Sequence, residues 1–223
     1  MAAPGPSDFF SGDFPEKTMK PRPLAALALA TFLAAGIAAQ ETAPLTIPFA
    51  DAFTSLRLAG RTASRGPWKI ADGVAACTQD DALYKQFKDH GPIIRWDLPF
   101  ENARIRFRYR ADASAKTFVF TANGETGHVF RFVTSAERGT DLRAFPPGGE
   151  AKSISIGRGG PKLQPGDWVS VVVELSGAKA TVKIGDDHET TAEHPSLSRP
   201  KKDVSLGFSF GAVAIRDFAI EAL

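Results

Sequence analysis

Between residues 104 and 110 the chain alternates without interruption between charged and apolar side chains. The charged positions are Arg104, Arg106, Arg108 and Arg110, and the apolar positions between them are Ile105, Phe107 and Tyr109. A period of two residues is typical of a β-strand with one face in water. No segment after residue 39 has ten or more residues of helical periodicity, so strands must cover the apolar faces of other strands.

Nine further short runs, rich in Phe, Val and Ile, have strand character: residues 68–71, 74–77, 117–121, 128–134, 153–156, 168–175, 180–184, 204–210 and 213–220. Asp72-Gly73 and Asn123-Gly124 are typical of two-residue hairpin turns, and Ser176-Gly177 predicts a third turn. About ten antiparallel strands predict an all-β, two-sheet antiparallel jelly-roll sandwich, with a barrel as the alternative.

Two polar segments are predicted to be loops. Residues 157–160 read Gly-Arg-Gly-Gly between two strands, which indicates a flexible connection. Residues 199–202, Arg-Pro-Lys-Lys, are predicted to be an exposed loop because proline cannot donate to a sheet ladder.

The amino-terminal region has the pattern of a secretory signal peptide. Residues 24–39 carry no charge, and Lys20 and Arg22 precede them. This run is short for a bilayer-spanning helix, and its small terminal residues favour cleavage after Ala38 or Ala39. We therefore expect residues 1–39 to be an upstream extension and signal peptide, with Met19 as the true start and a retained signal anchor as the alternative. Residues 40–223 are then one secreted or periplasmic domain, without stable membrane insertion.

Composition limits the ligands. Lys and Arg total 27 against 25 Asp and Glu, and this net charge of +2 does not indicate a nucleic-acid partner. The single cysteine, Cys77, has no partner in the chain for a disulfide and is expected to be a small buried residue. Four scattered histidines lack the spacing of zinc ligands, an acidic turn at residues 186–189 is only a weak calcium signal, and no cofactor motif is present. We therefore expect neither a metal nor a cofactor.

Three segments carry a resemblance to a known family. They are residues 49–53 with 68–74 (FADAF and WKIADGV), residues 166–177 (GDWVSVVVELSG), and residues 204–208 with 213–218 (VSLGF and VAIRDF). Together they resemble the secreted 3-keto-disaccharide hydrolase domain family, of which the chain would be a divergent member. The resemblance implies a concanavalin A-like lectin/glucanase fold and action on glycans. The stretch 122–128 and Asp217 depart from the family pattern, so no catalytic position is carried over.

The densest polar cluster, residues 89–97, suggests a sugar site. Asp89 and His90 could act in general acid–base catalysis, because a neighbouring carboxylate raises the pKa of an imidazole. Arg95 and Trp96 could bind the ligand, the indole face stacking on the C–H face of a sugar ring. The alternative is structural: a Gly91-Pro92 turn, a core Trp96, and a His90 that binds a backbone carbonyl.

His128 is the third candidate catalytic residue, and Arg131 a further ligand-binding candidate. Strand alternation places their side chains on opposite faces, so the two can share a pocket only across a bulge. The alternative is a structural histidine at the strand edge.

Arg106 and Arg108 could hold an anionic glycan, since a guanidinium binds a carboxylate or sulfate through two hydrogen bonds. The alternative is a solvated face whose charges pair with Asp or Glu on neighbouring strands.

These patterns lead to two functional hypotheses. The first is a secreted glycan-active or glycan-binding jelly-roll protein, which as an enzyme would be a hydrolase or lyase acting on 3-keto-glycosides. The E-x-D-x-x-E spacing of retaining glycosidases is missing from the sequence, which disfavours glucanase chemistry. The second hypothesis is a non-catalytic cell-surface module that binds carbohydrate or protein. In both, a di- or polysaccharide is the expected ligand.

Overall fold

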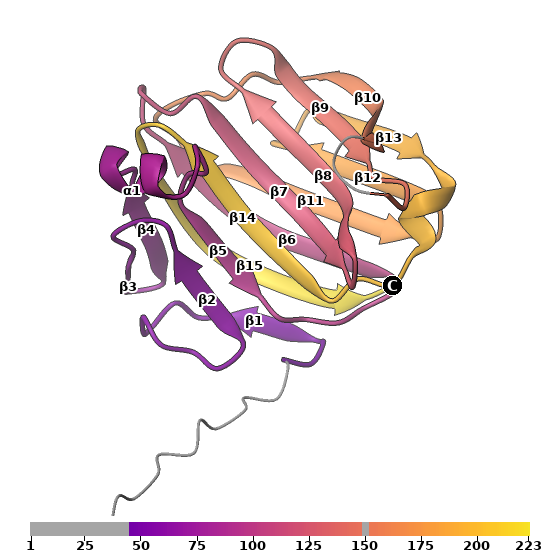
Figure 1. The fold of residues 1–223 in the computed structure, drawn as a ribbon, viewed down its shortest axis with the longest axis horizontal. Coiled ribbons are helices and arrows are strands. Elements are labelled where there is room, and N and C mark those ends of the chain that lie inside the picture. The colour runs from indigo at the N-terminus through magenta and orange to yellow at the C-terminus, as the bar shows by residue number, and fades with distance from the viewer. Residues whose placement is uncertain (1–44, 149–151) are drawn as a thin grey trace, which may run out of the picture. The chain divides into compact units, whose positions relative to one another are not determined.

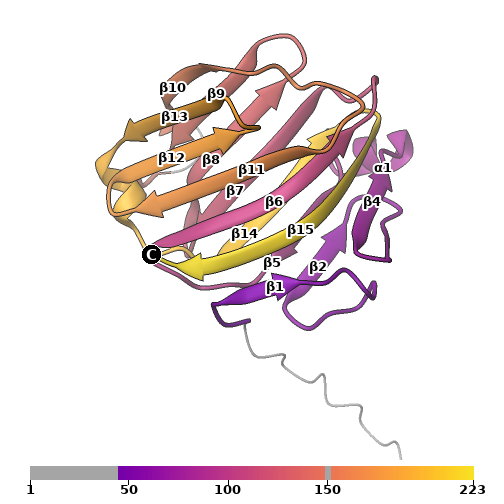
Figure 2. The same ribbon diagram turned by 180° about the vertical axis from the view of Figure 1, so that it is seen from behind.

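A computed structural model of the protein describes residues 45–148 and 152–223. The predicted signal peptide, its cleavage site and the alternative start at Met19 lie outside the described residues. Within these residues the chain forms two antiparallel β-sheets that face each other, as Figures 1 and 2 show from opposite sides. The predicted all-β, two-sheet antiparallel sandwich of jelly-roll type is confirmed.

The eight-stranded sheet, here called sheet A, follows the order β13-β12-β11-β6-β15-β4-β3, and β1 also pairs with β15. Its strands are β1 (Phe49–Asp51), β3 (Lys69–Ala71), β4 (Val74–Thr78), β6 (Ala103–Ala111), β11 (Val169–Ser176), β12 (Lys179–Ile184), β13 (His188–Glu193) and β15 (Ala212–Ala222). Sheet A is the nearer layer in Figure 2.

The seven-stranded sheet, sheet B, follows the order β10-β9-β8-β7-β14-β5-β2. Its strands are β2 (Arg61–Ser64), β5 (Ile93–Trp96), β7 (Thr117–Gly124), β8 (Gly127–Ser135), β9 (Gly139–Ala144), β10 (Ile154–Gly160) and β14 (Asp203–Ser209). One short helix, α1 (Asp81–Gln86), lies between β4 and β5 in the chain, and a 3-10 turn, η2 (Pro195–Ser198), precedes β14.

Aromatic rings from the inner faces of both sheets fill the core. On β6 the alternation predicted from sequence holds, with Phe107 and Tyr109 almost fully buried. The Tyr109 ring stacks on Phe118 of sheet B at a centroid distance of 4.3 Å, and Phe107 lies parallel to Phe120 at 6.2 Å. Burial raises the pKa of the Tyr109 phenol to about 12, because ionisation inside this apolar layer is unfavourable.

One of the two hairpin turns predicted from Asp-Gly and Asn-Gly pairs is confirmed. Asp72 and Gly73 both have positive φ, 53° and 80°, as a type I′ turn requires. Asn123 and Gly124 are instead the last residues of β7, and the turn lies at residues 125–126. Gly127, with φ of 88°, supplies the left-handed residue after this turn. The side chain of Asn123 therefore belongs to a strand.

Both predicted loops are wrong in part. Residues 157–160 belong to β10, which pairs with β9 through two register shifts, so the glycines accommodate bulges in an edge strand. In the predicted exposed loop 199–202, Lys201 is buried at 2% exposure and pairs with Phe100 through two backbone hydrogen bonds of 2.8 Å. Its Nζ donates to the Glu101 carbonyl at 2.8 Å and lies 5.9 Å from the centre of the Phe100 ring.

Burial lowers the pKa of Lys201 to about 8, against an ordinary value of 10.5. Between these two values the unfolded chain binds a proton that the folded chain lacks, so folding becomes more favourable as the pH rises. We expect the free energy of unfolding of the wild type, relative to K201M, to rise by about 1–2 kcal/mol from pH 8 to pH 10.5. Urea denaturation at several pH values measures this difference, and a constant difference would contradict it.

A buried ion pair joins the two sheets near the start of the described chain. Arg61 Nη1 donates to both Asp51 carboxylate oxygens at 2.8 and 2.7 Å, with side-chain exposures of 1% and 2%. The Trp96 indole donates to the same carboxylate at 2.8 Å and stacks on Phe218 at 3.8 Å. Since Trp96 is fully buried, it has no free ring face, and the prediction that it stacks on a sugar is wrong.

Candidate functional site

A groove of about 830 Å³ runs over the outer face of sheet B. Strands β5, β7, β8 and β14 form its floor, and the segment after α1 forms one wall. Five of the eight predicted site residues line it, namely Asp89, His90, Arg95, His128 and Arg131. These residues are spread from position 89 to position 131 of the chain, and the fold brings them to one face.

A β-bulge allows His128 and Arg131 to line the same groove. Asn123 pairs with His128 and Ala122 pairs with Phe130, so Val129 is an extra residue on β8. Val129 and Phe130 are both buried, which shifts the alternation by one position. The bulge that the sequence analysis required for a shared pocket is thus present.

The centre of the groove holds a hydrogen-bond chain of three side chains from three strands. Asn123 of β7 donates through Nδ2 to Asp203 Oδ1 of β14. The Oδ1 of Asn123 is bonded to Nδ1 of His128 on β8. Because this amide oxygen can only accept, His128 Nδ1 carries the proton, and in the neutral imidazole Nε2 carries the lone pair. The chain therefore fixes the tautomer and the orientation of His128.

Asp203 is a buried carboxyl group, only 3% exposed, beneath this chain. Burial raises its pKa above the ordinary value, while the hydrogen bond from Asn123 and the positive charge of Arg95 act in the opposite direction. A carboxylate held by an amide donor makes the amide oxygen a better acceptor for the imidazole proton. Asp203 thus supports the position of His128 through Asn123.

His90 lies on the wall of the groove, in the predicted alternative role of binding a backbone carbonyl. Its Nδ1 is 2.9 Å from the carbonyl oxygens of Phe87 and Lys88, so this nitrogen carries the proton. Lys88 and Asp89 both have positive φ, 55° and 62°, in the tight turn that follows α1. The imidazole is anchored to this turn. Within the described residues, no hydrogen bond joins the Asp89 carboxylate to the His90 ring, as the predicted activation of His90 would require.

Two of the three arginines that line the groove, Arg95 and Arg131, are held from different sides. Arg95 lies on β5 and forms a half-exposed ion pair with Asp97, with Nε and Oδ1 3.2 Å apart. Arg131 donates from Nε to Thr121 Oγ1 at 3.4 Å, and its guanidinium lies 5.0 Å from the centre of the Phe145 ring. Guanidinium groups in such positions can donate to the hydroxyl or carboxyl oxygens of a ligand.

Among the groove residues that sequence reasoning missed, three matter most for the site: Tyr84, Asn123 and Asp203. Tyr84 of α1 lines it and packs against the half-exposed Phe210 at a centroid distance of 5.5 Å, which gives the groove an aromatic rim. Asn123 was taken for a turn residue, and Asp203 follows a segment that was taken for a loop. Both Asn123 and Asp203 lie on strands with their side chains toward the groove, and the sequence pattern did not identify these two positions as part of a strand.

Arg106 and Arg108 lie on the outer face of sheet A, away from the groove. Arg106 Nη1 is 3.3 Å from a carboxylate oxygen of Glu221, and Arg108 Nη1 is 3.9 Å from one of Asp217. Both arginines therefore have carboxylate partners on the neighbouring strand β15, and their binding of an anionic glycan stays a prediction.

Among the described residues, no group of three or more His, Cys, Asp or Glu side chains is placed to hold a metal ion. No helix in this part of the chain has the length and apolar character needed to cross a bilayer.

Searches with protein-family profiles and against curated protein sequences gave no match. Among solved structures, the chain is similar to the carbohydrate-binding module CBM66 from Bacillus subtilis, with 10% identity and a TM-score of 0.55 over 81% of this chain and 100% of that one. It is also similar to the CBM2 module of the evolved Dit protein of Lactobacillus casei BL23 phage J-1, with 14% identity and a TM-score of 0.57 over 77% and 93%.

A sialidase is a third similar structure, with 9% identity and a TM-score of 0.58 over 78% of this chain. This chain spans only 18% of that sialidase. Identities this low support the common fold alone, and they agree with the jelly-roll sandwich described above.

Proposed function

We propose that this protein binds carbohydrate in the groove over the outer face of sheet B. The observation that carries the proposal is the hydrogen-bond chain His128–Asn123–Asp203, which fixes an imidazole at the floor of an open groove. Sugar hydroxyl groups both donate and accept. A fixed imidazole and arginine donors in one groove suit such groups, and the Tyr84 rim offers an apolar surface to the C–H face of a ring.

The similar structures support this proposal at the level of the fold. Two of them are carbohydrate-binding modules by name, and both cover more than three quarters of this chain. The resemblance to 3-keto-disaccharide hydrolase domains and the expected export to the periplasm or the medium are compatible with the same proposal. Both remain predictions from the sequence.

A calorimetric screen of the protein against native and 3-keto disaccharides tests this function. We expect saturable binding of at least one sugar, weakened about tenfold in H128A, which corresponds to roughly 1.4 kcal/mol. H188A is the matched control, because His188 lies on β13 of sheet A. Equal affinity of H128A and wild type for every bound sugar would reject the groove as the site.

A second candidate function is cleavage of 3-keto-glycosides, either by hydrolysis or by the elimination that a lyase catalyses. It is favoured by the presence of His90 and His128 in one groove. Each ring donates from Nδ1–H to an acceptor oxygen, so that Nε2 carries the lone pair in the neutral ring. In this candidate His128 acts as general base or acid, and Asn123 and Asp203 position it. His90, on the groove wall next to Asp89, is the second general acid–base residue.

Turnover assays distinguish the enzyme from the binding module. For an enzyme, we expect H128A to lose at least a hundredfold in kcat on a 3-keto-disaccharide, and H90A to lose turnover with only a few degrees of change in Tm. Binding without turnover in the wild type would leave the carbohydrate-binding module as the function.

A further inference from the structure

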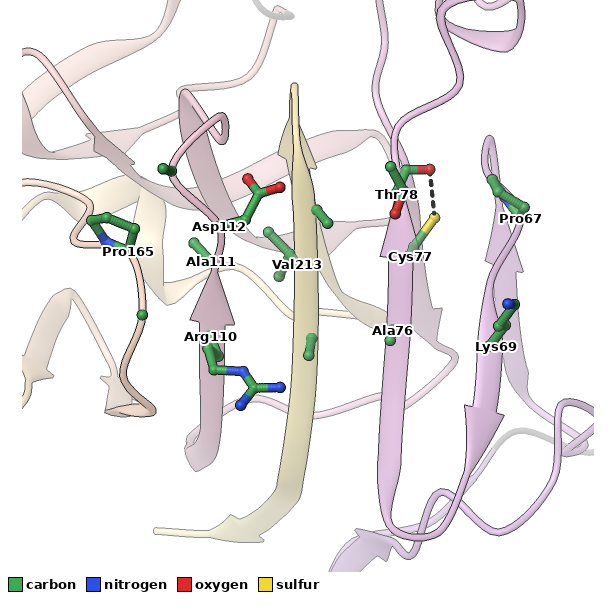
Figure 3. A pocket seen from close by; sticks show the side chains of 14 residues that line it. Pro67, Lys69, Ala76, Cys77, Thr78, Arg110, Ala111, Asp112, Pro165 and Val213 are labelled. Atoms are coloured by element: carbon green, nitrogen blue, oxygen red, sulfur yellow. Dashed lines mark hydrogen bonds between the residues drawn. The ribbon is translucent and has the colours of Figure 1, made fainter.

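A second pocket, of about 850 Å³, lies on the outer face of sheet A, on the other side of the sandwich from the groove. Strands β3, β4, β15 and β6 form its floor, and Pro67 and Pro165 stand at its rim (Figure 3). Cys77 also borders it, with its thiol bonded to the Thr78 carbonyl, and burial raises the pKa of this thiol to about 12. The expectation of a buried Cys77 is confirmed, and the unreactive thiol does not define the pocket.

One row of cross-strand neighbours runs through this pocket. Arg110 of β6 pairs with Ala214 of β15, Ala214 pairs with Ala76 of β4, and Ala76 pairs with Lys69 of β3. Two cations therefore end a row whose centre holds only methyl groups. Three strand spacings separate its ends, roughly 14 Å.

The arginines on this face differ in their partners. Four of them have carboxylates within ion-pair distance: Arg104 with Glu174 and Glu221, Arg106 with Glu221, and Arg108 and Arg216 with Asp217. Arg110 has none among the described residues, and neither has Lys69. The guanidinium of Arg110 lies 5.1 Å from the centre of the Trp168 ring, and Arg216 shares this ring at 4.2 Å.

Asp112, the acidic residue in the pocket lining, does not neutralise Arg110. Its carboxylate accepts from the backbone of Ser114 and Ala115 at 3.0 and 2.9 Å and so holds its own turn. The exposed Arg110 and Lys69 thus leave an excess of positive charge around an apolar floor.

We propose that this pocket is a second ligand site, which binds a carboxylate-bearing carbohydrate chain lying across the strands. Arg110 and Lys69 bind carboxylate groups at the two ends, and the methyl groups of Ala76 and Ala214 contact the C–H faces of the sugar rings between them. This site is independent of the groove on sheet B and does not require that the groove binds sugar.

The sheet itself favours a carbohydrate over an acidic peptide. Extended peptides bind sheets by adding a strand to an open edge. Strands β4, β15 and β6 in the pocket floor have hydrogen-bonded neighbours on both sides, whereas β3 is an edge strand. A peptide strand added to β3 would lie beside the pocket, in the plane of the sheet, and not across the floor. The backbone groups of the other three strands are already paired, whereas a sugar chain bound through carboxylates and ring faces needs no backbone partner.

Titration calorimetry with oligogalacturonate tests the site. We expect saturable binding by the wild type, at least fivefold weaker binding by R110Q, and no measurable binding by the double variant R110Q/K69Q. R104Q is the matched control, because Arg104 lies on the same strand and face but pairs with carboxylates, and it should bind as the wild type does. The methyl-esterified oligomer, which lacks the charges, should not bind.

A further variant fills the pocket without changing the charge. A214L should also abolish binding while Tm stays within a few degrees of the wild-type value. Equal weakening by R104Q and R110Q would show general attraction to a cationic face and overturn the proposal, as would binding of the esterified oligomer. Loss of binding in H128A with full binding in R110Q would place oligogalacturonate in the groove, which overturns this second site and leaves the proposed function intact.

Discussion

D51A should lower the free energy of unfolding by about 3–5 kcal/mol, the largest loss expected from any single substitution considered for this protein. The Asp51 carboxylate accepts hydrogen bonds from Arg61, from Trp96 and from the backbone N–H of Phe53, all in a buried setting. Without it, a guanidinium remains in the apolar interior with no counter-charge. The loss is measured by urea denaturation at neutral pH.

Two further variants define this result. D51N keeps the shape of the side chain but not the charge, so it should also be strongly destabilised, and it serves if D51A does not fold. E174A removes a carboxylate from a half-exposed pair with Arg104, and it should shift the unfolding midpoint far less because water screens that pair. Similar losses of unfolding free energy in D51N and E174A would contradict the prediction, because the buried pair would then contribute no more to stability than the half-exposed one.

N123A should weaken sugar binding in the groove at least tenfold and also destabilise the fold. Asn123 is the link between His128 and Asp203, so its removal frees the imidazole to rotate and leaves Asp203 without its amide donor. A buried acceptor without a donor costs about 1–3 kcal/mol. Calorimetric titration with the sugar identified in the screen, together with denaturation, gives both quantities.

The pH dependence of N123A separates its two effects. Loss of the Asn123 donor should raise the pKa of Asp203 further, because that hydrogen bond favours the carboxylate. A raised pKa in the folded state reduces stability as the pH rises from the unfolded value through the folded one, so the deficit of N123A should be largest at neutral pH and shrink in acid. N102A is the matched control, since Asn102 holds the backbone of Gly177 at a hairpin turn. Equal sugar affinities in N102A and N123A would contradict the proposal that the hydrogen-bond chain His128–Asn123–Asp203 supports sugar binding.

The fold could be predicted because its main signals are local. Alternation in the segment 104–110 identified the central strand of sheet A, β6. The pair Asp72-Gly73 identified the hairpin between β3 and β4 of the same sheet. Short strands with few apolar residues were not predicted from the sequence; examples are β2 (Arg61–Ser64) and β13 (His188–Glu193). Their positions depend on neighbours in the sheet, which no local pattern contains.

The site was predicted in its parts but not in its connections. His128 and Arg131 could share a pocket only through a bulge, and the extra residue Val129 is visible in the pairing of strands rather than in the sequence. Trp96 was wrongly predicted to bind sugar because an indole next to polar residues is typical of a sugar-binding surface. Its N–H instead donates to Asp51, which lies 45 residues earlier in the chain. Contacts over such separations decide which polar residues face water.

Amide hydrogen exchange with and without a bound neutral disaccharide tests the central claim most directly. If the groove on sheet B is the sugar site, protection should increase in β7, β8 and β14 and at residues 88–95, and stay unchanged in β6 and β15. Protection confined to β6, β15 and β4 would contradict the account, because it would place the sugar on the opposite face of the sandwich.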